Sequence, residues 1–217
     1  MILLAVDTCL DACSVAVLKD GAILAARSEP MTRGHQERLA LMVRETMAEA
    51  GVSFGDLTRV AATVGPGSFT GLRVGLSFAK GLAQALGVPL AGVGTLPALA
   101  GDRPGLVCAA VDGRRGQIFI QAFRDGRSLM APDALPVETA AARLAELGAD
   151  GQTLLVGSGA ALLSPLLPGA RVEPASHADP AQVARLAAAM PAPLPPARPL
   201  YLRAPDAKLP GGLDPAA

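Results

Sequence analysis

Aromatic residues are scarce in this sequence. Among its 217 residues there is no tryptophan, and there are one tyrosine and five phenylalanines. We therefore expect a core of leucine, valine and alanine, and the scarcity argues against aromatic platforms on which nucleobases stack. The three cysteines form no C-x-x-C pair, which argues against a zinc site and against a disulfide framework: Cys9, Cys13 and Cys108.

Charge of either sign is also sparse and is balanced. Lysine plus arginine and aspartate plus glutamate each number 19, so the formal net charge is zero. A protein that binds nucleic acid by itself carries a basic excess or a basic stripe, and neither is evident. The composition therefore argues against tight RNA binding by this chain alone and leaves a surface shared with a partner open.

Long hydrophobic runs are missing as well. The first residues, MILLAVDTCLDAC, lack a basic start, and Asp7 interrupts the apolar run, so a first strand is favoured over a signal peptide. No run of 18 apolar residues occurs, which argues against a membrane span. We expect a cytoplasmic protein. Since 51% of the residues are hydrophobic, the chain can bury a large core in one domain or two lobes.

The first half predicts strands that form hairpins, followed by alternating helices and strands. Asp20-Gly21 is a hairpin turn, because this dipeptide tolerates positive φ. Hydrophobic periodicity then predicts an order of β-β-β-α-β-α, over residues 2–6, 14–18, 22–26, 35–50, 57–64 and 70–86.

The second half repeats this order in part, which suggests two duplicated α/β lobes. Its predicted elements are strands at 106–111, 117–123 and 128–130, a helix at 137–147, a strand at 153–156 and a last helix at 181–190. We therefore predict an N-terminal lobe over residues 1–100 and a C-terminal lobe over 101–190. Residues 191–217 form a Pro-rich tail that packs back on the body.

The most distinctive segment is GPGSFTGLRVG, at residues 65–75. It is not a P-loop, because no Lys-Ser or Lys-Thr follows Gly71, and it is not a nucleophile elbow, because Pro66 replaces the first glycine. Two interpretations remain. The turn could bind an anion at a helix N-terminus, or its small residues could let backbones approach closely, and we favour the second.

The helix after this segment is apolar almost all round. Its polar side chains form one narrow stripe, which consists of Arg73, Ser77, Lys80 and Gln84. Such a helix is expected to be buried on two sides. It is either a core helix between the lobes or a helix that packs against a partner subunit, and Gly71, Gly75 and Ala79 would permit close contact.

Acidic residues at two strand ends are weak candidates for a nucleotide site. Asp7 and Asp112 could hold Mg²⁺ in one cleft, with Gly157 opening a third loop. We favour the interpretation that each aspartate caps a turn, because no lysine or second acid is near. His35 has Leu39 one turn later, so we expect an exposed or capping histidine and no metal site.

Four segments in this order closely resemble the TsaB (YeaZ) family, the non-catalytic paralogues of TsaD. They are AVDT at 5–8, GPGSFTGLRVG at 65–75, DGRRGQIF at 112–119 and PLYLRAPDAK at 199–208. The resemblance spans essentially the whole chain. It implies an α/β fold of the actin-like ATPase class (ASKHA, RNase H-like) with two β-β-β-α-β-α lobes.

The resemblance also implies a function in tRNA modification. Family members act with the catalytic subunit TsaD and the ATPase TsaE, which transfer a threonylcarbamoyl group to N6 of adenosine 37 in tRNAs that read codons beginning with A (t6A). It implies a scaffold with no catalytic residue, metal or cofactor of its own, while the partner complex uses ATP and Mg²⁺. The tRNA is reached only through the complex, and the isolated protein can form a homodimer.

In the family the first two helices pair with those of TsaD. Transferred to this sequence, the resemblance makes seven residues candidates for the interface: Leu39, Met42, Met47, Leu72, Leu76, Ala79 and Ala83. Arginine at position 76 or 79 would then disrupt association and spare the fold. The alternative function is an ATP-binding phosphotransferase or ATPase of the same fold class, acting in the cleft of Asp7, Asp112 and Gly157.

Overall fold

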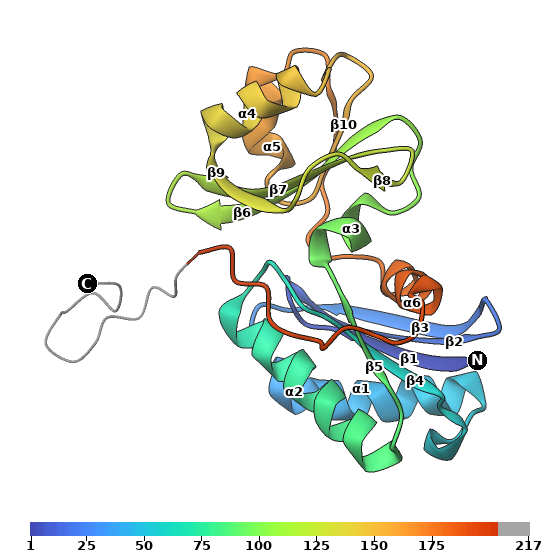
Figure 1. The fold of residues 1–217 in the computed structure, drawn as a ribbon. Helices are drawn as coiled ribbons and strands as arrows, with labels where there is room; N and C mark the ends of the chain where they lie inside the picture. The colour runs from blue at the N-terminus through green and yellow to red at the C-terminus, as the bar shows by residue number, and fades with distance from the viewer. Residues whose placement is uncertain (204–217) are drawn as a thin grey trace, which may run out of the picture.

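The protein folds into two lobes, one above the other, as seen in a computed structural model that describes residues 1–203 (Figure 1). The first lobe contains a five-stranded sheet in the order β3-β2-β1-β4-β5. The three N-terminal strands are antiparallel, and β1, β4 and β5 are parallel. The strands are β1 (Ile2–Asp7), β2 (Ala12–Lys19), β3 (Ala22–Pro30), β4 (Arg59–Thr63) and β5 (Leu90–Val93).

Two long helices cover one face of this sheet, α1 (His35–Ala50) and α2 (Phe69–Leu86), with a short 3-10 turn, η1 (Phe54–Asp56), after α1. Each helix ends at a glycine in the left-handed conformation, Gly51 and Gly87, both with φ of 66°. Their apolar stripes pack on β1, β2 and β4 in one continuous core cluster. The predicted helix boundaries agree with α1 and differ by one residue at the start of α2.

The second lobe repeats this plan around a sheet in the order β11-β10-β6-β7-β8, with β9 also paired to β7. Its strands are β6 (Leu106–Arg114), β7 (Gln117–Arg124), β8 (Arg127–Ser128), β9 (Asp133–Pro136), β10 (Leu154–Val156) and β11 (Arg171–Glu173). Its helices are α4 (Val137–Glu146), α5 (Ala160–Leu163) and the 3-10 turn η2 (Ser164–Leu166). The predicted order of elements in two related lobes is confirmed.

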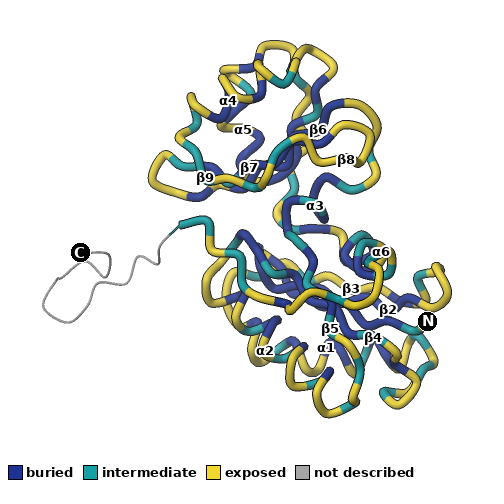
Figure 2. Tube along the Cα trace, in the orientation of Figure 1, coloured by how far each residue is buried: buried dark blue, intermediate teal, exposed yellow. Residues whose placement is uncertain are grey.

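The last helix, α6 (Pro180–Ala189), packs on the open face of the first sheet, although we predicted it within the C-terminal lobe. Val183, Ala184 and Ala187 are fully buried there. They share a core cluster with Leu3 of β1 and Val107 of β6, so the two lobes are joined by apolar packing (Figure 2). The physical reason is that an apolar sheet face must be buried, and the apolar side of α6 covers it.

Several short elements carry no periodic signal in the sequence and were not predicted. They include α3 (Thr95–Ala100), which leads from β5 into the second lobe, and the strands β5, β9 and β11. Each has six residues or fewer, which is too short for a hydrophobic pattern to be recognised.

The Pro-rich segment after α6 runs along the first lobe. Ala197 is 9% exposed and belongs to the core cluster under α1 and α2, and the Leu200 N–H donates to the Val64 carbonyl oxygen at 2.7 Å. The rest of the predicted tail, from residue 204 onward, lies outside the described residues. Among residues 1–203, none of the helices combines the length and hydrophobicity that a membrane span requires.

Candidate functional site

The glycine-rich segment packs directly on the turn between β1 and β2. A Cβ atom on Gly67 would lie 2.2 Å from the Cys9 carbonyl oxygen, and one on Gly71 would lie 2.0 Å from the Thr8 carbonyl oxygen. A Cβ on Gly75, one turn further along α2, would lie 2.5 Å from Thr8 Oγ1. The close-approach interpretation of this motif is therefore confirmed, because only glycine leaves room for the facing backbone.

Hydrogen bonds fix the same contact. Thr8 Oγ1 donates to the Gly71 carbonyl oxygen at 2.7 Å, and the Ser68 N–H donates to the Cys9 carbonyl oxygen at 2.7 Å. Ser68 Oγ also caps α2 by accepting the Gly71 N–H at 3.2 Å. The first turn of α2 is thus anchored to the β1–β2 turn, and the motif sets the position of α2.

Asp7 is enclosed beneath this anchor and is 1% exposed. Its Oδ1 accepts the Cys9 N–H at 2.8 Å and the Thr63 hydroxyl at 2.6 Å, and its Oδ2 is buried without a hydrogen-bond partner. Burial raises the pKa of this carboxyl above its ordinary value. The Asp7 carboxyl does not fit a Mg²⁺–nucleotide complex, because it is almost fully buried and its Oδ1 already accepts two hydrogen bonds.

Asp112 and the loop at Gly157 do meet. The Asp112 N–H donates to Ser158 Oγ at 3.1 Å, and Asp112 Oδ1 accepts the Arg114 N–H at 2.7 Å, so Asp112 caps a turn as we favoured. Gly157 lies against the Ala110 carbonyl oxygen, where a Cβ would be 2.3 Å away. Within residues 1–203, no group of three or more His, Cys, Asp or Glu side chains could hold a metal ion.

His35 is the first residue of α1, is 8% exposed and makes no capping hydrogen bond, so the expectation of an exposed or capping histidine was wrong. Its Nε2 is buried without a hydrogen-bond partner. Leu39, one turn later, is a core residue, as the sequence already indicates.

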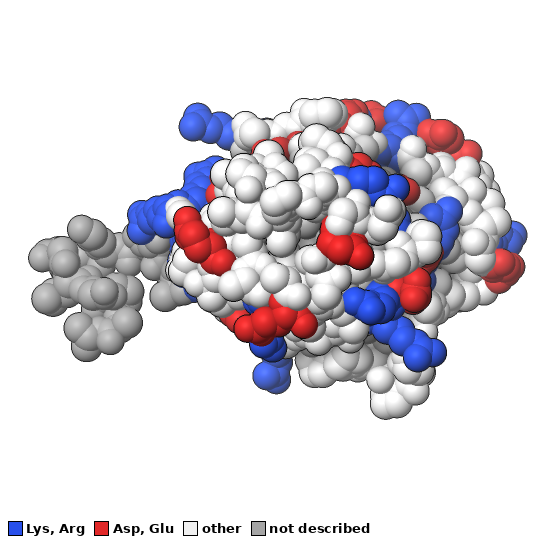
Figure 3. All heavy atoms as spheres, turned by 90° about the horizontal axis from the view of Figure 1, so that it is seen from above, with Lys and Arg blue, Asp and Glu red and all other residues white. Residues whose placement is uncertain are grey.

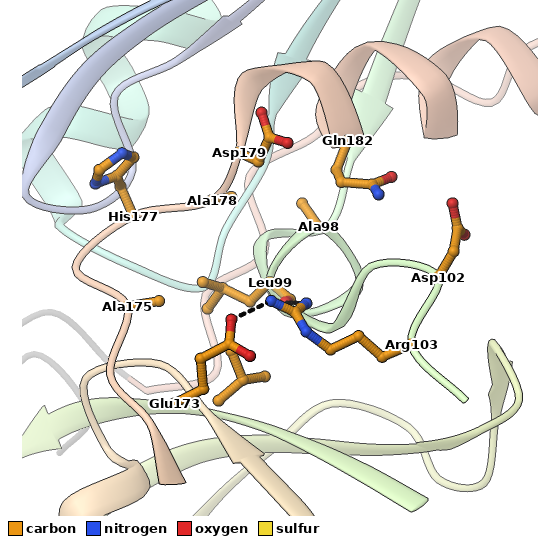
Figure 4. Close-up of a pocket in the computed structure, with 11 residues that line it drawn as sticks. Ala98, Leu99, Asp102, Arg103, Glu173, Ala175, His177, Ala178, Asp179 and Gln182 are labelled. Atoms are coloured by element: carbon orange, nitrogen blue, oxygen red, sulfur yellow. Dashed lines mark hydrogen bonds and ion pairs between the residues drawn. The ribbon is translucent and has the colours of Figure 1, made fainter. Parts of the chain in front are cut away.

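A cavity of about 430 Å³ lies where the chain passes between the lobes (Figure 4). Arg103 ties its two sides together: Nη1 donates to the carbonyl oxygens of Leu99 at 2.9 Å and Ala100 at 2.8 Å, and Nη2 pairs with Glu173 of β11. None of the three nucleotide-site candidates lines this cavity. We interpret the cavity and its ion pair as part of the connection between the lobes.

The seven predicted interface residues are all buried in the first lobe, each no more than 5% exposed. They belong to one core cluster, so the assignment of these positions to a partner surface is corrected; of the seven, Leu39 also borders the groove between the two helices. The physical reason is that the helices have apolar residues on more than one face, and periodicity does not indicate which face lies on the sheet. The corrected positions are Leu39, Met42 and Met47 on α1 and Leu72, Leu76, Ala79 and Ala83 on α2.

The opposite sides of α1 and α2 form an exposed surface with a groove of about 470 Å³. Phe69 is 44% exposed at one end of it, and Leu41 on the outer side of α1 is 49% exposed. The predicted polar stripe of α2 is exposed, so α2 is buried by its own lobe on one side only. The groove is lined by Gln36, Leu39, Phe69, Thr70, Arg73, Val74, Ser77 and Phe78; we call this surface the helix-pair groove.

Asp7 predicts a pH effect on stability. Because the folded-state pKa is raised, the unfolded chain ionises first as the pH increases, and the free energy of unfolding falls between the ordinary and the raised pKa. We expect the difference in unfolding free energy, wild type minus Asp7→Asn, to decrease as the pH rises from about 4 to about 8. Urea unfolding at a series of pH values measures it.

The control is a non-titrating substitution at an exposed position, Gln84→Asn, which should show no such trend. A difference for Asp7→Asn that increases with pH would mean that the folded protein stabilises the ionised carboxylate, contrary to the enclosure described above.

Two lobes with duplicated sheets of this order, joined through a shared core, define the actin-like ATPase (ASKHA) fold class. The sequence profile of the family described as "TsaD: tRNA N6-adenosine threonylcarbamoyltransferase" matches residues 27–157, and the chain belongs to this family.

Within this family, the chain is similar in sequence and structure to TsaB (YeaZ) proteins. It is 39% identical to the tRNA threonylcarbamoyladenosine biosynthesis protein TsaB of Escherichia coli over 55% of this chain, and the match spans about half, 53%, of that protein. It is 35% identical to an uncharacterised Mycobacterium bovis protein over 94% of this chain and 93% of that one. The solved structure of YeaZ from Pseudomonas aeruginosa is 30% identical, with a TM-score of 0.74 over 86% of this chain and 90% of that chain.

Proposed function

We propose that the chain is the non-catalytic subunit of the complex that forms t6A in tRNA. It supports a catalytic TsaD paralogue, which transfers the threonylcarbamoyl group to N6 of adenosine 37, and the ATPase TsaE completes the complex. The observation that carries the proposal is the helix-pair groove: a glycine motif anchors α2 so that exposed apolar side chains of two helices face outward together.

The enclosure of Asp7 supports the non-catalytic assignment. Asp7, the strand-end aspartate considered as a Mg²⁺ ligand, is buried and its carboxyl has a raised pKa. We therefore propose that the chain has no cofactor of its own and that ATP and Mg²⁺ act in the partner complex. The tRNA is contacted through that complex.

The partner surface lies on the outer side of α1 and α2. Val74 and Phe78 are half-buried on the wall of the groove, and Phe69, which also lines it, is exposed. Apolar side chains gathered on two parallel helices fit the matching helices of a paralogue with the same topology. In the absence of the paralogue, a second copy of this chain can cover the same surface.

We expect Val74→Asp combined with Phe78→Asp to weaken association with the TsaD paralogue at least tenfold, because both side chains line the groove. Both also pack against the core cluster, so the variant should remain folded with a lower melting temperature. Co-elution of the two purified proteins and thermal unfolding of the variant measure the two quantities. Gln84→Asp, on the polar stripe of the same helix, is the matched control and should co-elute normally.

Activity provides the functional test. The chain alone should form no t6A, and its addition to TsaD, TsaE, tRNA and threonylcarbamoyl-adenylate should restore the modification. Full activity of TsaD and TsaE without this chain would contradict the scaffold proposal. Micromolar binding of ATP to the isolated chain in calorimetry would instead favour the alternative, a phosphotransferase or ATPase that uses the cleft at Asp112 and Gly157.

A further inference from the structure

Two of the six aromatic residues in the chain lie side by side on the surface at one end of the helix-pair groove. The rings of Phe69 and Tyr201 have centroids 5.4 Å apart and are tilted by 34°. They are 44% and 48% exposed, respectively. Phe69 lines the groove, whereas Tyr201 belongs to the C-terminal segment that follows α6. A side chain from a distant part of the sequence therefore extends the groove beyond its two helices.

The backbone on both sides of this tyrosine is held in place. The Leu200 N–H donates to the Val64 carbonyl oxygen at 2.7 Å. A Cβ on Gly65 would lie 2.9 Å from the Leu200 carbonyl oxygen, so the segment sits against the first glycine of the motif. Arg203 Nη1 donates to the Gly113 carbonyl oxygen of the second lobe at 2.7 Å. An exposed ring that is already fixed in position loses little conformational freedom when a partner covers it.

Among the described residues that line the groove, one carries a charge, and it lies beside the same rings. Arg73 is exposed, and its guanidinium carbon is 5.2 Å from the centre of the Phe69 ring. A cation at the edge of an apolar groove is complementary to an acidic side chain on the helix that fills the groove. A second copy of this chain would bring the same cation to this surface. Charge complementarity therefore favours a different partner.

The top of the second lobe has another character. In the view from above, acidic and basic side chains are interspersed there with uncharged ones (Figure 3). A surface with charges of both signs mixed in this way is typical of one that stays in contact with water. We therefore place the partner contact on the first lobe and the C-terminal segment, and take the control position from the second lobe.

We propose that Tyr201 and the C-terminal segment around it form part of the surface that binds the TsaD paralogue. The Phe69–Tyr201 pair takes an apolar side chain of a partner helix, and Arg73 pairs with an acidic side chain on that helix. The identity of the partner rests on the proposed function. Tyrosine and arginine are among the residues that contribute most to the affinity of protein interfaces. The contact thus extends from α1 and α2 onto a segment that also reaches the second lobe.

The single tyrosine of the sequence allows a direct test. A fluorinated tyrosine incorporated into the chain labels position 201 alone. We expect unlabelled TsaD paralogue to move the fluorine NMR resonance and to reduce its shift between H2O and D2O, because the ring leaves water and enters an interface. An unchanged resonance in a mixture that co-elutes as a complex would place Tyr201 outside the interface and overturn the inference.

Affinities for the paralogue, from titration calorimetry, identify the contribution of each side chain. Tyr201→Ala should raise the Kd about tenfold, and Tyr201→Phe should keep the wild-type Kd, because the ring is retained. Combined with Phe69→Ala, Tyr201→Ala should have a smaller effect than the product of the two single effects, because the rings contact each other. Arg73→Gln should raise the Kd at low salt, and its difference from wild type should diminish as the salt concentration rises.

Leu166→Ala shortens a side chain that is 44% exposed in the second lobe, so it is the control and should bind like wild type. Circular dichroism should show the native fold in every variant. A wild-type Kd for Tyr201→Ala, together with weak binding by the Val74→Asp/Phe78→Asp variant, would confine the partner to the helices. That result overturns the inference and leaves the proposed function standing.

Two further outcomes also decide the matter. A wild-type chain that does not associate with the paralogue contradicts the proposed function, and this inference with it. A fluorine resonance that changes with the concentration of this chain alone, and not with the paralogue, would assign Tyr201 to a homodimer and overturn the choice of partner.

Discussion

Replacing Gly71 with alanine is expected to destabilise the protein by about 3 kcal/mol or more, although alanine is the better helix former. The new Cβ would lie 2.0 Å from the Thr8 carbonyl oxygen. This clash is between the backbone of the helix and the backbone of the turn, so no side-chain rotation can relieve it. For a chain of this size, such a loss corresponds to a decrease in melting temperature of roughly 6 to 12 °C. Circular dichroism during heating measures it.

Gly81 in the same helix provides the matched control. It is exposed, and no atom lies within 4 Å of a Cβ placed there. Gly81→Ala should therefore stabilise the protein by roughly 0.5 to 1 kcal/mol. Equal effects of the two substitutions would show that helix propensity governs both positions and that the contact with the β1–β2 turn is unimportant.

Replacing Ala79 with arginine is expected to prevent folding. Ala79 of α2 is fully buried in the apolar core cluster between the helices and the sheet. A large unpaired cation at this point costs more than about 4 kcal/mol, which is comparable to the whole stability of many domains. The variant should be insoluble or unfolded, as judged by expression, circular dichroism and urea unfolding. This prediction replaces the expectation from the sequence that arginine at position 79 would disrupt association and spare the fold.

Ala85→Arg makes the same substitution on the exposed face of α2 and should change the unfolding free energy by less than about 0.5 kcal/mol. A folded, monomeric Ala79→Arg protein that fails to bind the paralogue would restore the original assignment of this face to the partner. It would require α2 to lie on the sheet through its other side.

The glycine motif contributes to function through position. The motif anchors the start of α2 on the β1–β2 turn and caps the helix with Ser68. The same helix presents Phe69, Val74 and Phe78 to the groove. The position of α2 is thus linked to the surface on which the proposed assembly depends.

Local patterns in the sequence determined much of the fold. Turn chemistry and hydrophobic periodicity act over a few residues. They predict the Asp-Gly hairpin, the helix at residues 35–50 and the glycine that ends each long helix. The duplicated order of elements follows from the same patterns, and so does the close-approach function of the glycines, because no lysine completes a phosphate loop. These features need no knowledge of distant contacts.

Only the tertiary structure decided which faces are buried and which residues meet. The side of α2 that contains Leu76 and Ala79 packs on the sheet. The other face of that sheet is covered by α6, although α6 follows the second lobe in sequence. The pairing of Phe69 with Tyr201, 132 positions later, depends on a C-terminal segment laid along the first lobe. Periodicity identifies an apolar face but not the surface that will cover it, because that choice minimises exposed area over the whole chain.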